Sequence, residues 1–167
     1  PTTLKFGLKS VRLFIMIKIT NNIDDIVPLW SEAFGDSRED IVFFIDNIRN
    51  GVCLAEFQND KAVSMLYLVD CCLNSKQAHY IYAACTDSKS RKKGYMSGLI
   101  KYCIDNYDRV CLIPADEHLV NYYNKQGLVF KHPVDDLKFN ECRELIDEYL
   151  YAGCSLDSPV VLANKGE

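Results

Sequence analysis

The sequence predicts a mixed α/β (α+β) fold with a mostly antiparallel central sheet flanked by helices. Three consecutive strand-like segments between residues 52 and 86 are joined by short turns at Asn59-Asp60 and Asn74-Ser75-Lys76, and such connections are typical of antiparallel neighbours. From Gly94 onward helix and strand patterns alternate, which favours a parallel or mixed second half. Helical segments with one apolar face lie on both sides of the strand region, so helices are expected to cover the sheet.

The amino-terminal part is expected to hold a strand and two helices. Residues 16–20 are strand-like, and an asparagine pair follows that can cap a helix over residues 23–34. Gly35 is a typical end for that helix, because the residue after the last turn often adopts a left-handed conformation. Pro28 lacks a backbone N–H and is expected to weaken or kink the helix, unless the helix begins later. A second helix is expected over residues 37–49.

The remaining expected elements follow without repeats or low-complexity linkers. Strands are expected over residues 52–58, 62–73, 77–86, 109–113 and 158–163. Helices are expected over residues 94–107 and 138–152, and a further short helix ends in the segment 122–130. We interpret the apolar stripe of the helix over 94–107 as core packing, so that this helix positions the loop before it.

Composition and charge restrict the class of protein. The chain has 167 residues, 49% of them hydrophobic and 25% charged, which suits one globular domain with a sizeable core. Its formal net charge of −4 gives no general attraction to nucleic acid, so a nucleic-acid binder is the least favoured class. Any phosphate site therefore has to be built locally. The pattern G-x-x-x-x-G-K-[ST] is absent, which excludes a P-loop NTPase.

The eight cysteines are interpreted as reduced apolar residues rather than as disulfides or metal ligands. No C-x-x-C pair occurs, and most of the cysteines lie in strand-like runs or on apolar helical faces. This usage is typical of a cytoplasmic protein without a bound metal. If a thiol nucleophile is present, Cys85 is the candidate, although no histidine is near it in the sequence.

No apolar run reaches the roughly 20 residues that a membrane-spanning helix needs, so no membrane partner is expected. Residues 1–15 carry basic residues and no acid, and their apolar run is too short for the core of a signal peptide. We interpret them as a leader or an expression remnant outside the fold, with Met16 as a sensible natural start. Residues 16–167 are then expected to form a single domain.

The most informative segment is Arg91-Lys92-Lys93-Gly94-Tyr95-Met96-Ser97, which lies between an expected strand and an expected helix. The first N–H groups of a helix have no carbonyl partner within it, and their partial positive charge suits an anion such as phosphate. Three cations add attraction, and Gly94 lets the backbone approach a ligand closely. Taken alone, these residues equally allow a solvated basic turn before an ordinary surface helix.

Together with a later segment, this loop resembles the signature of the GNAT family, the Gcn5-related N-acetyltransferases. Arg91 and Gly94 match the acyl-CoA loop Q/R-x-x-G-x-G/A of that family. Tyr123 and Gly127 match the Tyr-x-x-x-Gly segment that carries its catalytic tyrosine. The resemblance covers roughly residues 17–131.

The match has two departures. Met96 replaces the last Gly/Ala of the loop, where a bulky residue could narrow the phosphate site, and Leu128 replaces the usual Phe of the later segment. Segment 91–96 and the run Ile113-Pro114-Ala115-Asp116 look most like the Eis-like branch of the family.

The resemblance implies a GNAT-like sheet with a splayed pair of strands, and an N-acetyltransferase that uses acetyl-CoA as its acyl donor. Residues 91–97 would hold the diphosphate of CoA, and the strand edge at Ala84, Cys85 and Thr86 would hold the pantetheine arm. Tyr123 would be the general acid, because a phenol stays protonated at neutral pH. Without the resemblance, packing against the core is the favoured interpretation of Tyr123.

The sequence does not single out a general base or an acceptor. Groups that could relay a proton are His79, Tyr80, Tyr82, His118 and the pair Asp116-Glu117. The amine could equally lose its proton to water before binding. The expected acceptor is an amine of a small molecule or a peptide, and homo-oligomerisation stays open. The alternative is a non-catalytic acyl-CoA-binding module or a fragment of a larger multidomain acetyltransferase.

Overall fold

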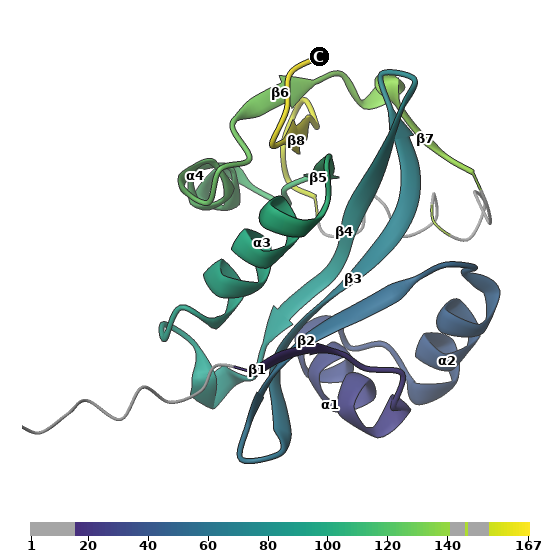
Figure 1. Cartoon of the computed structure of the whole chain (residues 1–167), viewed down its shortest axis with the longest axis vertical. Coiled ribbons are helices and arrows are strands. Elements are labelled where there is room, and N and C mark those ends of the chain that lie inside the picture. Colours follow the sequence, from purple (N-terminus) through teal and green to yellow (C-terminus); the bar gives the residue numbers. More distant parts are fainter. Residues whose placement is uncertain (1–15, 141–145, 147–153) are drawn as a thin grey trace, which may run out of the picture.

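The structure is a computed structural model, and it describes residues 16–140, 146 and 154–167. The expected leader over residues 1–15 lies outside the described residues, as does most of the helix expected over 138–152. The described part is a mixed α/β fold in which an eight-stranded, mostly antiparallel sheet is flanked by helices (Figure 1). The predicted fold class is therefore confirmed.

The elements of the described part follow one another from β1 to β8. In chain order they are β1 (Met16–Ile19), α1 (Ile23–Phe34), α2 (Arg38–Asn47), β2 (Val52–Gln58), β3 (Lys61–Leu73), β4 (Lys76–Thr86), α3 (Tyr95–Asn106), β5 (Val110–Leu112), α4 (Glu117–Lys125), β6 (Phe130–His132), β7 (Leu137–Phe139) and β8 (Val161–Ala163). Two single-turn helices, η1 (Ser88–Ser90) and η2 (Val134–Asp136), lie in the connections before α3 and β7.

The sheet is ordered β1-β2-β3-β4-β5-β8-β6, and β7 pairs with the last residues of β3. β4 and β5 pair in parallel, whereas the other described pairings are antiparallel. Parallel neighbours need a crossover connection, and α3 supplies it. The helix of this crossover begins at Tyr95, within the segment 91–97 that the sequence predicts to bind phosphate.

The helices lie on opposite faces of the sheet, with α1 and α2 on one side and α3 on the other (Figure 1). Trp30 of α1 and Phe44 of α2 pack against Tyr67 and Tyr82 of the sheet, with ring centroids 4.8 to 6.2 Å apart. This aromatic cluster fixes α1 over the middle of β3 and β4.

Both amino-terminal helices begin and end where local chemistry places them. The Asn22 side chain accepts a hydrogen bond from the N–H of Asp24 at 3.1 Å, and Gly35 ends α1 with φ of 75°. Ser37 caps α2 in the same way. α1 runs through the exposed Pro28 from Ile23 to Phe34, as predicted, and it does not begin later to avoid the proline. The missing N–H removes one hydrogen bond, while the apolar face of α1 stays packed on the sheet.

Two short strands were not expected from the sequence. Residues 137–139 form β7, where a helix was expected from residue 138; Leu137 and Phe139 are buried while Lys138 is exposed, which is the alternation of a strand. β6 is equally short, and three residues are too few for alternation to stand out in a sequence. Both strands owe their conformation to pairing with distant partners, β3 and β8.

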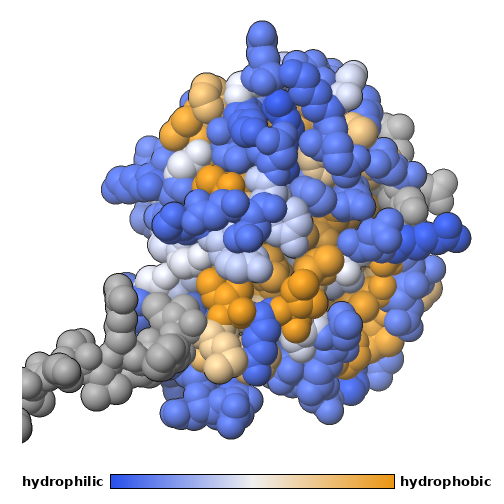
Figure 2. Space-filling view, in the orientation of Figure 1, coloured by the Kyte–Doolittle hydropathy of each residue, from blue (hydrophilic) through white to orange (hydrophobic). Residues whose placement is uncertain are grey.

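The face seen in Figure 2 is mostly hydrophilic, and hydrophobic residues gather near its centre. Within the described residues, no helix is long and apolar enough to cross a membrane. Large exposed hydrophobic side chains include Phe34, Phe43 and Phe130. Phe34 is the one among these three that lines the cavity beside β4, which is described below.

Candidate acyl-transfer site

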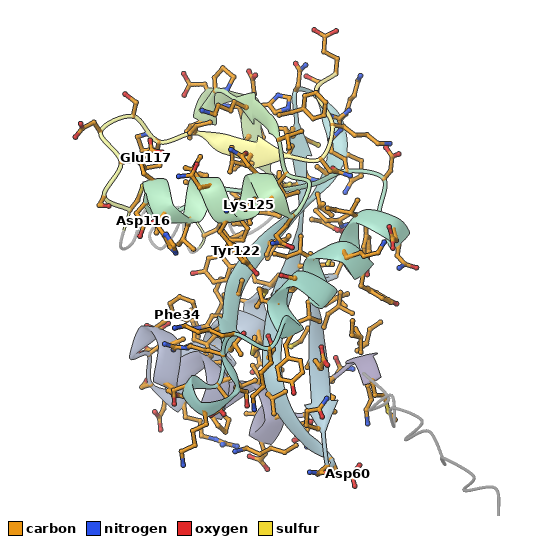
Figure 3. The ribbon with its side chains drawn as sticks, turned by 90° about the vertical axis from the view of Figure 1, so that its left-hand side faces the viewer. Phe34, Asp60, Asp116, Glu117, Tyr122 and Lys125 are labelled. Carbon is orange, nitrogen blue, oxygen red and sulfur yellow. The ribbon has the colours of Figure 1, made fainter. Side chains whose placement is uncertain are left out.

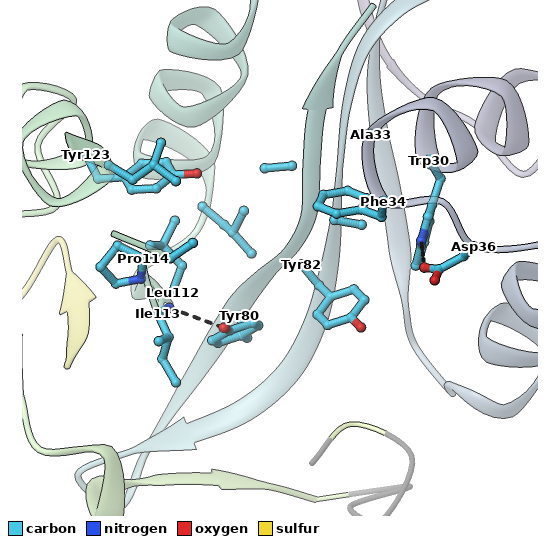
Figure 4. Close-up of a pocket in the computed structure, with 15 residues that line it drawn as sticks. Trp30, Ala33, Phe34, Asp36, Tyr80, Tyr82, Leu112, Ile113, Pro114 and Tyr123 are labelled. Carbon is cyan, nitrogen blue, oxygen red and sulfur yellow. Dashed lines mark hydrogen bonds between the residues drawn. The ribbon is translucent and has the colours of Figure 1, made fainter. Parts of the chain in front are cut away.

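β4 and β5 are paired over a short stretch and then separate. The residue pairs that join them are His79–Val110 and Tyr80–Cys111. Beyond these pairs, the hydroxyl oxygen of Tyr80 accepts a hydrogen bond from the N–H of Ile113 at 3.2 Å (Figure 4). A side chain thus takes the place of a strand partner, and β4 continues to Thr86 without described pairing to β5. This is the splayed strand pair that the resemblance implies.

A β-bulge turns β4 at the point where the two strands separate. The register against β3 shifts between Tyr82 and Cys85, so Ala83 and Ala84 together face a single residue of β3. Ala83 has φ of 50°, in the left-handed region that residues with a side chain rarely adopt. A bulge bends its strand and increases the local twist, which accounts for the departure of β4 from β5.

A cavity of about 420 Å³ lies where the strands separate (Figure 4). α1 and the turn after it form one wall, residues 80–84 of β4 line the middle, and residues 112–115 with α4 form the opposite wall. The lining is mostly apolar and aromatic, and Asp36 is the one charged residue in the described lining. Concave, largely apolar sites with a few polar groups are typical of small-molecule binding.

The cavity opens to solvent between α1 and α4. Phe34, at the end of α1, is 51% exposed although it lines the cavity. Figure 3 shows Phe34 on one side of the opening and α4, with Asp116 and Tyr122, on the other. A small molecule can therefore reach the cavity from this side without crossing the gap between the strands.

Tyr123 of α4 lies in the cavity wall, and its hydroxyl points into the cavity (Figure 4). The residue is 8% exposed, and its ring meets that of Tyr122 edge-on at a centroid distance of 5.2 Å. Burial raises the pKa of Tyr123 to about 12, with smaller contributions from Tyr122 and Asp116. The phenol therefore keeps its proton at neutral pH and can donate it, or a hydrogen bond, into the cavity.

The loop after β4 enters α3 through a glycine in the left-handed conformation. Gly94 has φ of 83°, and a Cβ built there meets nothing within 4 Å. Backbone conformation, rather than a close contact inside the protein, therefore favours glycine here. The first helical hydrogen bond of α3 runs from the N–H of Gly98 to the C=O of Gly94 at 3.0 Å. The N–H groups of residues 95–97 precede it and have no acceptor within the helix.

The three cations of this loop differ in their contacts. Nε of Arg91 donates a hydrogen bond to the C=O of Thr86 at 3.3 Å, which folds this side chain against the end of β4. Lys92 and Lys93 are exposed and make no ion pair with the described residues. Arg91 thus shapes the loop, while the two lysines can meet an anion at the start of α3.

A hydrogen bond joins the start of α3 to α4. Ser97 Oγ lies 3.3 Å from Tyr122 Oη, and Tyr122 precedes Tyr123 in the same helix. Met96 is half-buried and packs against the core. The residue that departs from the family motif therefore fills space under the helix, and the exposed part of the loop keeps its glycine.

The three residues expected along the pantetheine arm have different surroundings. Ala84 lines the cavity. Burial, with a smaller contribution from Glu32, raises the pKa of Cys85 to about 12, so its thiol stays neutral and is a poor nucleophile. The Ser64 hydroxyl donates to the C=O of Cys85 at 3.2 Å and lies 2.8 Å from Thr86 Oγ1, so these two groups face β3.

The histidines considered as general bases do not line the cavity. His79 lies on the α3 side of β4, where its Nδ1 pairs with Asp70 Oδ1 at 3.0 Å, and His118 is exposed on α4. Tyr80 and Tyr82 do line the cavity, on the face opposite His79, as the alternation of the strand predicts. Burial raises the pKa of Tyr80 well above its usual range, so this phenol is protonated at neutral pH.

Sequence reasoning missed the wall of the cavity that α1 and the following turn provide. Nε1 of Trp30 donates a hydrogen bond to Oδ2 of Asp36 at 2.8 Å, and both residues line the cavity. In the sequence, Trp30 belongs to an ordinary apolar helical stripe, and Asp36 lies in the turn between two helices. Neither pattern shows that both residues face a bulge in a strand much later in the chain.

A sheet that opens into an apolar cavity, with a basic helix start in the loop that follows the strand lining it, suits a transferase whose acyl carrier is a long chain ending in phosphates. The family model described as "Acetyltransferase (GNAT) domain" matches residues 18–146, well over half of the chain. The chain therefore belongs to the GNAT acetyltransferase family, and the family resemblance drawn from the loop and from Tyr123 is confirmed.

Solved structures of the same fold include complexes with CoA. A Bacillus subtilis acetyltransferase in complex with CoA matches with a TM-score of 0.58 and 15% identity, covering 89% of this chain and 97% of that one. The GNAT family N-acetyltransferase YhbS of Escherichia coli, also in complex with CoA, matches with a TM-score of 0.56 and 11% identity over 68% of this chain and 67% of that one. At these identities the likeness shows the fold.

Some matching proteins are much longer than this chain. A protein from Pyrococcus horikoshii matches with a TM-score of 0.53 and 16% identity over 66% of this chain, and only 42% of its own length is covered. For a protein from Enterococcus faecalis the covered share is 33%. None of the curated proteins matches the sequence.

Proposed function

We propose that the protein is an N-acetyltransferase that moves an acetyl group from acetyl-CoA to an amine of a small molecule or a peptide. One arrangement supports the proposal most directly. The gap between β4 and β5 opens into a cavity, and the hydroxyl of the buried, protonated Tyr123 points into that cavity. Membership of the GNAT acetyltransferase family supports an acyl-CoA donor.

In this proposal the donor lies along the gap from the loop to Tyr123. The amides of residues 94–97 and the exposed Lys92 and Lys93 bind the diphosphate, because an anion gains both from free helical N–H groups and from nearby cations. The unpaired edge of β4 at Ala84 receives the pantetheine arm, whose amides can continue the sheet. The acetyl group then enters the cavity beside Tyr123.

In this proposal the amine attacks the thioester directly, without an acyl-enzyme, and transfer proceeds by addition and then elimination. The neutral amine attacks the carbonyl carbon, and the resulting tetrahedral intermediate expels the CoA sulfur as the C–S bond breaks. Tyr123 gives its proton to that sulfur and takes the proton that the acylated nitrogen releases, so an amide and a free thiol form and the phenol is restored. Because the pKa of Tyr123 is about 12, its phenolate is short-lived and recovers a proton readily.

A second candidate function is a non-catalytic acyl-CoA-binding module, or a fragment of a larger acetyltransferase. Two observations favour it: Met96 occupies the last position of the loop motif, and no histidine or glutamate lines the described cavity. A module would bind acetyl-CoA and turn nothing over. Placement in the Eis-like branch stays a prediction from the loop and segment 113–116.

The test is a panel of primary amines incubated with acetyl-CoA, with release of free thiol as the readout and mass spectrometry of the amine as confirmation. We expect thiol release above the background hydrolysis rate for at least one amine, matched by an equal amount of acetylated product. If acetyl-CoA raises the melting temperature but no amine is acetylated, the module is the better description.

A further inference from the structure

The wall of the cavity opposite Tyr123 carries a fixed carboxylate. Asp36 follows the left-handed Gly35 at the end of α1, and its Oδ2 accepts a hydrogen bond from Nε1 of the buried Trp30 at 2.8 Å. Its backbone C=O accepts a second hydrogen bond from the Ser31 hydroxyl at 2.6 Å. The Asp36 carboxylate is thus held in place by the turn and by the indole.

The charge of this carboxylate has no counterion in the described part of the chain. The Trp30 indole is neutral, and no described lysine, arginine or histidine forms an ion pair with Asp36. The rest of the described lining is uncharged. Asp36 is half-buried, so solvent screens its charge less than that of a fully exposed carboxylate, and it attracts a cation more strongly than such a group would.

Aromatic rings stand beside this carboxylate. Trp30 and Tyr82 are tilted against each other at a centroid distance of 5.7 Å, and Phe34 lies next to them at the opening. The faces of aromatic rings attract ammonium groups, and an adjacent carboxylate adds a charged hydrogen-bond acceptor. This end of the cavity is therefore suited to a cationic group carried on an apolar chain.

The carboxylate and the proposed acid belong to opposite walls of the cavity. Figure 4 shows Tyr123 on one side, Trp30 and Asp36 on the other, and Tyr80 with Tyr82 between them. An amine held as an ammonium ion at Asp36 has no free electron pair on its nitrogen, so it cannot be the nucleophile. The nucleophile has to be a different, neutral amine of the same molecule.

We infer that the acceptor is a diamine or polyamine, whose distal ammonium group binds Asp36 between Trp30 and Phe34 while its other amine is acetylated beside Tyr123. The apolar chain between the two nitrogens lies along Tyr80 and Tyr82. Because no cation lines the described cavity, an amine that carries a carboxylate at the distal end is rejected. This inference rests on the proposed function and specifies its acceptor.

The experiment compares acceptors of equal length that differ only at the distal end. Putrescine, cadaverine and hexamethylenediamine are each paired with the matching monoamine, and cadaverine also with δ-aminovalerate. We expect kcat/KM to be about tenfold or more higher for the best diamine than for its monoamine, the effect typical of a hydrogen bond to a charged group. The amino acid should be the poorest acceptor.

Asp36→Asn keeps an oxygen that can accept from the Trp30 indole and removes the charge. This variant should lose about tenfold in kcat/KM for the diamines, mainly through KM, and leave the monoamines and acetyl-CoA binding unchanged. Glu39→Gln, which removes an exposed charge outside the cavity, is the matched control.

The possible outcomes distinguish a failure of the inferred acceptor from a failure of the proposed function. If monoamines are acetylated as well as diamines and Asp36→Asn changes neither, the inference about the acceptor is overturned and the proposed function stands. If no amine at all is acetylated, both fall. Should Asp36→Asn melt at a much lower temperature, the comparison of diamine, monoamine and amino acid with the unaltered protein decides the question alone.

Discussion

Tyr123 illustrates how position alone can suit a common side chain to a specific chemical role, here the proposed one of general acid. The same ring that fills space beside Tyr122 presents its hydroxyl to the cavity, and burial keeps that hydroxyl protonated. Cys85 is also buried and also has a pKa raised to about 12, yet it does not line the cavity. Burial therefore keeps the proton on both groups, but only Tyr123 lies where the proposed chemistry can use it.

Replacing Tyr123 by phenylalanine removes the proposed proton donor and keeps the ring. Turnover should fall by about 10²–10⁴-fold, the range typical of a general acid, while acetyl-CoA affinity stays nearly the same. Steady-state kinetics together with calorimetric titration of acetyl-CoA check this. Tyr122→Phe is the neighbouring control and should keep most of the activity; equal turnover in the Tyr123 variant would remove this residue from the mechanism.

Glu56 of β2 is a buried carboxylate that the proposed chemistry does not use. It is 0% exposed, its Oε2 has no partner among the described residues, and its Oε1 accepts a hydrogen bond of 3.4 Å from Gln58. Burial raises the pKa of Glu56 above its ordinary value, with the Gln58 hydrogen bond acting in the opposite direction. The native protein therefore binds this proton more tightly than the unfolded chain does.

The sign of the pH effect follows from that difference. The free energy of unfolding should fall as pH rises from the ordinary glutamate pKa through the raised one, because the folded state must then hold an unpaired buried charge. Glu56→Gln should lack this loss and be more stable by about 1–3 kcal/mol near neutral pH. Urea unfolding between about pH 5 and about pH 8 tests it, with the exposed Glu39→Gln as control; parallel pH curves for Glu56→Gln and the unaltered protein would contradict it.

At the scale of elements, the loop between β4 and α3 combines two separate requirements in one position. The backbone at Gly94 has to be left-handed for α3 to begin there. The same turn exposes the amides of residues 95–97, to which the diphosphate is proposed to bind. Nothing inside the protein lies within 4 Å of a Cβ at this position. The backbone requirement and the ligand requirement can therefore be separated by the size and charge of a substituted side chain.

Gly94→Ala and Gly94→Glu make that separation. Both should lose roughly 1–2 kcal/mol of stability, because a side chain disfavours φ near +83°. Only the glutamate adds a negative group where the diphosphate is proposed to bind, so it should abolish the rise in melting temperature on adding acetyl-CoA, whereas the alanine variant keeps part of it. Differential scanning fluorimetry gives the comparison, and an undiminished rise in Gly94→Glu would refute the assigned loop.

The elements also show where reading the sequence succeeds and fails. Helix caps at Asn22 and Ser37, and the long strands β3 and β4, follow local rules and were expected. β6 and β7 were missed because their conformation depends on pairing with β8 and β3 rather than on their own three residues. The bulge at Ala83 could not be predicted from the sequence either, because alanine, unlike glycine, rarely adopts the left-handed conformation found there.

The candidate site divides in the same way. Tyr123 and the loop residues 91–97 were expected because contiguous motifs carry them, and their roles stay predictions. A place for Trp30 and Asp36 in the site could not be predicted, because the cavity that they line forms only when α1 packs over a bulge in β4. Sequence patterns thus predict the proposed donor side of the site, whereas the proposed acceptor side can be recognised only in the structure.

At the scale of the whole molecule, acetyl-CoA is proposed to bridge parts that are otherwise joined mainly through the sheet: the loop before α3, the edge of β4 and the wall formed by α4. A ligand that binds only the folded state stabilises it by about 2.7 kcal/mol at a concentration of 100 times Kd. The melting temperature should therefore rise on the order of 5–10 °C. CoA should give a similar rise, and adenosine, which lacks the diphosphate and the pantetheine arm, should give none; a rise with adenosine alone would place the binding energy elsewhere.

The early separation of β4 from β5 also bears on how the protein avoids self-association. Unpaired strand edges usually lie at the rim of a sheet, where they invite a strand from another chain. Here unpaired backbone lies in the interior of the sheet, between two strands that Tyr80 and the pairs at its closed end hold at a fixed spacing. A polypeptide strand would need room for side chains above and below this slot, whereas a slender amide-containing chain does not. At this slot, unpaired backbone groups are thus available to a small molecule without inviting a strand from another chain.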